Sequence, residues 1–118
     1  MIKNLLILIV ALLHVYFLVL EMFFWTKPLG LKAFNQTPEN AKITKTLAAN
    51  QGLYNGFLSA GLIWSLFESN SEFAKFIKIF FLDCVIVAGA YGAYSVHRKI
   101  FFIQALPALI ALAFVYLN

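Results

Sequence analysis

The length of its apolar runs limits what this chain can fold into, and the first run is the clearest. It extends from residue 5 to residue 25. A helix of that length, rising about 1.5 Å per residue, spans a hydrocarbon core about 30 Å thick. Lys3 precedes the run as in a signal peptide, but bulky residues from Met22 to Trp25 replace the small side chains that cleavage needs. The run therefore predicts a retained membrane-spanning helix, with Trp25 at the membrane–water boundary.

Three further runs follow, at about residues 46–67, 76–96 and 100–117. The sequence Thr37-Pro38-Glu39 has the pattern of a helix start, so the second helix should extend back to about residue 38. Pro107 should kink the last span. We therefore expect an all-α fold, an integral membrane four-helix bundle that forms a single transmembrane domain over residues 1–118.

Composition supports this fold class and narrows the function. Apolar residues make up 63% of the chain and charged residues 12%, so membrane lipid is the expected surrounding. No basic stripe interleaves with aromatic residues, which argues against nucleic-acid binding. Cys84 is the one cysteine, and helical metal-ligand spacings are absent, so no disulfide and no metal site are predicted.

Positive charge is unevenly distributed between the two sides of the predicted bundle. By the positive-inside rule, the more basic connections face the cytoplasm, which places both termini outside. The basic residues of the first and third connections are Lys27, Lys32, Lys42, Lys45, Arg98 and Lys99, against Lys3, Lys75 and Lys78 on the other side.

A polar segment interrupts the second apolar run. At about 100° per residue, its polar residues fall within one arc of roughly 140°, and its small residues lie on the opposite side. The small face predicts close helix packing, within the chain or in a homo-oligomer; the run from Ala88 to Ala93 predicts the same. The polar set is Asn50, Gln51, Tyr54 and Asn55; the small set is Gly52, Gly56 and Ala60.

Polar side chains from all four spans fall at similar depths. Glu21, Asn50, Gln51, Tyr91 and Gln104 lie about 6 to 8 Å from the cytoplasmic end of their spans. Tyr54, Asn55 and His14 lie nearer the midplane. We therefore predict a cytoplasmic-side pocket that binds a small amphipathic or lipid-like molecule. Its predicted ligand-binding residues are Glu21, Asn50, Gln51, Tyr54, Asn55, Tyr91 and Gln104.

Glu21 and His14 are the candidate catalytic residues. An ionisable group at the bilayer centre costs about 2.5 to 3.5 kcal/mol, so such groups usually face the bundle interior. The two residues are seven apart and share one helix face. Structural alternatives remain: Glu21 bonded to the carboxamides of Asn50 or Gln51, and His14 as a satisfied core residue. Asp83 is the second acid inside an apolar run, and its structural alternative is a pair with Lys78 or His14.

Four motifs carry a resemblance over nearly the whole chain. They are the run from Leu13 to Trp25, Asn50-Gln51-Gly52-Leu53-Tyr54-Asn55-Gly56, Gly89-Ala90-Tyr91-Gly92, and Gln104-Ala105-Leu106-Pro107-Ala108. The sequence resembles the small bacterial membrane family catalogued as domain of unknown function 1304. The resemblance implies a multi-pass protein of the bacterial (inner) cell membrane, and it brings no established activity.

The architecture is also distantly similar to the membrane-associated eicosanoid and glutathione metabolism proteins. We do not expect this chain to bind their thiol cofactor, because its second span lacks the basic residue and the paired Glu of those proteins. The cofactor and any enzymatic activity are left unassigned. Two alternatives to a binding protein or enzyme stay open: a small proton-coupled transporter that uses Glu21 or Asp83, and a structural or assembly protein whose polar face joins helices.

Overall fold

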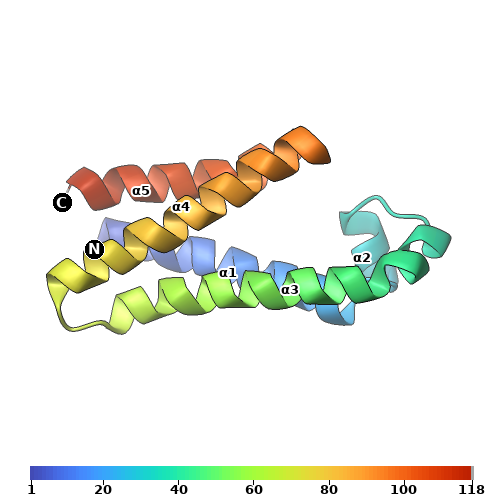
Figure 1. The fold of residues 1–118 in the computed structure, drawn as a ribbon, viewed down its shortest axis with the longest axis horizontal. Coiled ribbons are helices and arrows are strands. Elements are labelled where there is room, and N and C mark those ends of the chain that lie inside the picture. Colours follow the sequence, from blue (N-terminus) through green and yellow to red (C-terminus); the bar gives the residue numbers. More distant parts are fainter. Residues whose placement is uncertain (118) are drawn as a thin grey trace. The chain divides into compact units, whose positions relative to one another are not determined.

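The structure is a computed structural model that describes residues 1–117 (Figure 1). No strand occurs in this part of the chain, so the all-α prediction is confirmed. In chain order the elements are α1 (Ile2–Phe23), α2 (Pro28–Ala33), α3 (Pro38–Phe67), α4 (Ser71–Ser95), the π-helical segment η1 (Phe101–Ala105) and α5 (Leu106–Leu117).

The four-helix count is not reproduced among residues 1–117, because the first connection contains the additional short helix α2. Proline and glycine in this connection predict breaks, but proline also fits the first turn of a helix, and Pro28 is the first residue of α2. The helix ends before Asn35, whose φ of 51° is left-handed, and the Gln36 amide donates to the Leu31 carbonyl at 2.9 Å.

The predicted start of the second long helix is confirmed. Helix α3 begins at Pro38, and the amide of Asn40 donates to Thr37 Oγ1 at 3.2 Å, as expected for an N-cap threonine. The indole nitrogen of Trp25 donates to Thr44 Oγ1 at 3.1 Å. This bond joins the beginning of the α1–α2 connection to the second turn of α3.

The irregularity expected near Pro107 takes the form of a π-helical turn. Proline lacks an amide hydrogen, and its ring collides with the carbonyl of the fourth preceding residue in a regular helix. Segment η1 lies immediately before α5, and the Leu106 amide donates to the Phe101 carbonyl five residues earlier. The wider turn lets the chain remain helical up to and beyond the proline.

The chain forms two compact units. Unit 1 contains residues 1–12 and the chain from Leu58 onward, and unit 2 contains Leu13–Phe57. In unit 1, α4 and α5 lie side by side (Figure 1). Helix α4 also packs against η1, where Gly89 is required because a Cβ there would lie 2.6 Å from the Ala105 nitrogen. The fully buried core of unit 1 comprises Ile7, Val10, Ala11, Leu62, Leu82, Val85, Ala108, Ala111 and Val115.

One helix among residues 1–117, α1, is both long enough and apolar enough to cross a membrane. The continuous helical stretch Phe101–Leu117 is apolar but shorter. Many large apolar side chains are exposed, including Phe67, Tyr94 and Leu117. Such an apolar surface is unusual for a soluble monomer.

We expect Thr37→Ala to weaken the start of α3 by about 1 kcal/mol, because the substitution leaves an amide of the first turn without its acceptor. The measurement is hydrogen exchange of the Asn40 amide in detergent micelles, which should speed up about fivefold. Thr46→Ala, at an exposed position inside α3, is the control. Equal exchange in the two variants would contradict the assigned cap.

Candidate functional site

The site is built around Glu21, which is only 2% exposed near the end of α1. Gln51 Nε2 donates to Glu21 Oε2, and Asn55 Nδ2 donates to Glu21 Oε1, both at 2.6 Å. Both oxygens of the carboxyl group therefore have a donor from α3. Among residues 1–117 no basic side chain acts on Glu21, so the two amides replace a counter-ion.

The close approach of α1 and α3 makes this arrangement possible. A Cβ on Gly52 would lie 3.0 Å from Glu21 Cβ and 3.2 Å from the Leu18 carbonyl oxygen. A Cβ on Gly56 would lie 2.7 Å from Leu18 Cδ1. The glycines of the small face are therefore used for packing inside unit 2, as the small-residue pattern predicts.

The predicted division of α3 into a polar face and an opposite small face is wrong for Asn55. Asn55 is 9% exposed and follows Gly52 by three residues, so the two side chains point to nearly the same side of the helix. Asn50 and Tyr54 lie on the other side and are exposed. The four polar side chains span an arc of about 140°, which is too wide for all of them to lie in one environment. Half of this arc faces α1 and the other half faces outward.

The predicted site residues therefore separate into distinct environments. His14 is fully buried in unit 2, and its ring meets Phe17 edge-to-face at 5.3 Å. Tyr54 is 60% exposed and packs near Phe57. Tyr91 and Gln104 belong to unit 1, on α4 and η1, where Tyr91 is exposed and Gln104 is half-buried. The pocket shared by all four spans stays a prediction.

The chemistry available at Glu21 follows from these contacts. A carboxylate accepts hydrogen bonds, and charge-assisted bonds from amides offset part of the cost of its burial. Glu21 is buried but its partner Gln51 is exposed, so the Gln51 side chain connects the acid to the surface of unit 2. Of the two predicted amide partners, Gln51 is confirmed, whereas Asn55 takes the place of Asn50.

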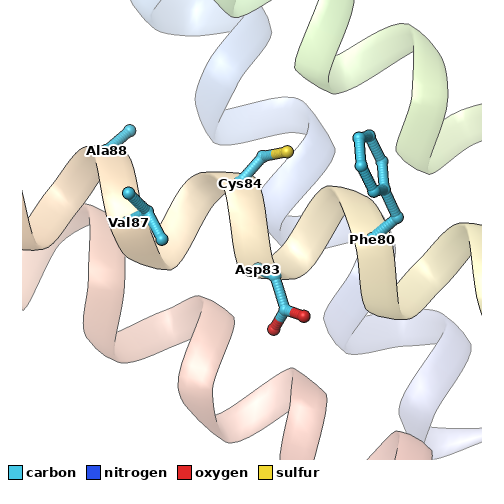
Figure 2. Close-up of a pocket in the computed structure, with 5 residues that line it drawn as sticks. All are labelled: Phe80, Asp83, Cys84, Val87 and Ala88. Atoms are coloured by element: carbon cyan, nitrogen blue, oxygen red, sulfur yellow. The ribbon is translucent and has the colours of Figure 1, made fainter.

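Two features of unit 1 escaped sequence reasoning. Lys78, counted above among the basic residues on the less basic side of the bundle, is 6% exposed, and its ammonium donates to the Ser65 carbonyl at 3.3 Å. That carbonyl lies in the last turn of α3, where the helix dipole favours a cation. The second feature is a hollow of about 420 Å³ on α4, with Asp83, Cys84 and Phe80 among its lining residues (Figure 2).

The sequence matches the family described as "Protein of unknown function (DUF1304)" over residues 8–116. The chain belongs to this family. A relative within the curated proteins, "Uncharacterized protein YpaA" of Lactococcus lactis subsp. lactis (strain IL1403), is 32% identical over 107 residues. The alignment covers 89% of this chain and 88% of the relative. No solved structure gives a significant match. The resemblance drawn from the motifs is thus confirmed.

We expect Gly52→Ala to lower the free energy of unfolding by about 1 to 3 kcal/mol. The new methyl group would lie 2.7 Å from Met22 Cγ, 3.0 Å from Glu21 Cβ and 3.2 Å from the Leu18 carbonyl oxygen, so it must separate α1 from α3. Thermal unfolding in detergent, followed by circular dichroism, measures the change.

Gly56→Ala is the matched control for this substitution. Its methyl group would meet only the flexible end of the Leu18 side chain, and replacing glycine in a helix gains about 0.5 to 1 kcal/mol. Similar losses of stability in both variants would contradict the close approach at Gly52.

Proposed function

We propose that this chain is a multi-pass protein of the bacterial cell membrane. The proposal is supported by the apolar helix α1, by the apolar stretch Phe101–Leu117 and by the large apolar side chains on the surface. The long helices α3 and α4 would complete the bundle. The distribution of positive charge favours an orientation with both termini outside the cytoplasm.

Within this bundle, the cluster of Glu21, Gln51 and Asn55 binds the polar part of a small amphipathic or lipid-like molecule. The supporting observation is a buried carboxyl group linked by an amide to a polar surface. Asn50 and Tyr54 extend that surface along α3, next to exposed apolar residues that suit an alkyl or aromatic tail. Glu21 serves as the hydrogen-bond acceptor that orients Gln51 toward the bound molecule.

The test compares the molecules that copurify with the wild-type protein and with Glu21→Gln in mild detergent. We expect mass spectrometry to find a small molecule whose retention falls at least fivefold in the variant. The neutral amide preserves side-chain shape, and Gln51 can turn its own amide to keep a hydrogen bond. Glu39→Gln, at an exposed position of the same unit, removes the same charge and should retain the molecule.

Equal retention by the three proteins, or no copurifying molecule in any of them, would contradict the binding role. The melting temperatures of the variants are measured in the same preparations. A loss of retention then counts only if Glu21→Gln remains folded at the temperature of purification.

A structural role is the second candidate, and one observation favours it. Both oxygens of Glu21 already have donors within the chain, so the cluster is complete without a ligand. In that role the amides join α1 to α3, and Asn55→Leu should lower stability by about 1 to 3 kcal/mol because it removes a donor from a buried acid. Unfolding that becomes easier in Asn55→Leu, with unchanged small-molecule content, would favour this candidate.

A further inference from the structure

One face of α4 is exposed along the whole helix. Its residues are spaced alternately by four and three positions, which places them on one side and matches the spacing at which paired helices meet. The opposite side of α4 packs into unit 1 through residues such as Leu82 and Val85. The exposed face, here called the α4 outer face, consists of Phe76, Phe80, Asp83, Val87, Ala90 and Tyr94.

Asp83 is the one charged residue of this face and the central residue of α4. No hydrogen bond or ion pair joins its side chain to any of residues 1–117. If α4 crosses the bilayer, as the proposed function requires, a carboxyl group at this depth is costly unless a polar group meets it. Lipid alone therefore cannot be what covers the α4 outer face.

We propose that the α4 outer face pairs with the same face of a second copy of this chain, with the two helices parallel. Copies inserted in one orientation meet about an axis normal to the membrane, so each residue lies opposite its own counterpart. The two Asp83 carboxyl groups then face each other. A protonated carboxyl group has one donor and one acceptor, so two protonated Asp83 side chains can donate to and accept from each other. Such a pair carries no net charge and needs no other residue.

The surroundings of Asp83 suit this occupant. Between apolar helices in lipid there is no hydrophobic driving force, so association depends on packing and on polar contacts. The hollow beside Asp83, about 420 Å³, gives room for the partner's side chains (Figure 2). It is lined by Phe80, Asp83, Cys84, Val87 and Ala88. A single polar position in an apolar seam also fixes the register of two paired helices.

Cysteine cross-linking in isolated membranes tests the pairing. Cys84→Ser removes the native thiol, and Val87→Cys in that background places a thiol on the α4 outer face, one turn from Asp83. Oxidation with copper phenanthroline should give a disulfide-linked species of twice the monomer mass. Ile110→Cys, exposed on α5, is the matched control and should give at least fivefold less.

The role of the acid is tested by a second substitution in the Val87→Cys background. Asp83→Asn keeps a hydrogen-bond donor and an acceptor and should retain the cross-link. Asp83→Leu needs no polar partner in lipid and should reduce the yield of the cross-linked species at least threefold. A cross-link that is absent, equal to that of Ile110→Cys, or unchanged in Asp83→Leu would overturn the proposal. A product joined to a molecule other than a second copy would overturn it as well.

Carbonate extraction of the same membranes separates this inference from the proposed function. Protein that stays in the membrane but does not cross-link contradicts only the pairing of α4. Protein released by carbonate contradicts both the pairing and the membrane location.

Discussion

The interaction on which unit 2 depends is the pair of hydrogen bonds that α3 donates to the buried carboxyl group of Glu21. A carboxyl group in apolar surroundings needs partners whatever else the protein does. Here the partners are the side-chain amides of Gln51 and Asn55, and a hydrogen bond forms only when donor and acceptor lie about 3 Å apart. The two helices must therefore approach closely, and the absence of a side chain at Gly52 is what permits it. The hydrogen bonds to Glu21 and the small size of Gly52 therefore depend on each other.

Sequence reasoning succeeded where the signal is local. The cap at Thr37, the start of α3 at Pro38 and the irregularity near Pro107 each follow from the chemistry of one or two neighbouring residues. The helical fold class follows from the long apolar runs in the same way. The burial of Glu21 and its bond to Gln51 were also predictable, because an acid inside an apolar run needs polar partners.

The remainder could not be predicted because it depends on which side of a helix meets its neighbour. Asn55 and Tyr54 are adjacent and both polar, yet one is buried at the contact with α1 and the other is exposed. Periodicity gives their angular separation but not the direction of the neighbouring helix. Lys78 shows the same limit: its side chain is long enough to reach an interface, but its ammonium donates to the Ser65 carbonyl near the end of α3 and stays buried in unit 1.

Glu21 and Asp83 show how one chain treats two acids in opposite ways. Glu21 has amide donors on both oxygens, and its neighbourhood is closed by glycine packing. Asp83 is exposed on a helix whose other side is already packed, so its own unit has no remaining surface with which to cover it. In the proposed membrane setting, Glu21 is satisfied by donors within the chain, whereas Asp83 gains a partner through the proposed pairing of two copies. Under the proposed pairing, the desolvation cost is offset by hydrogen bonds inside the chain at Glu21 and by association of two copies at Asp83.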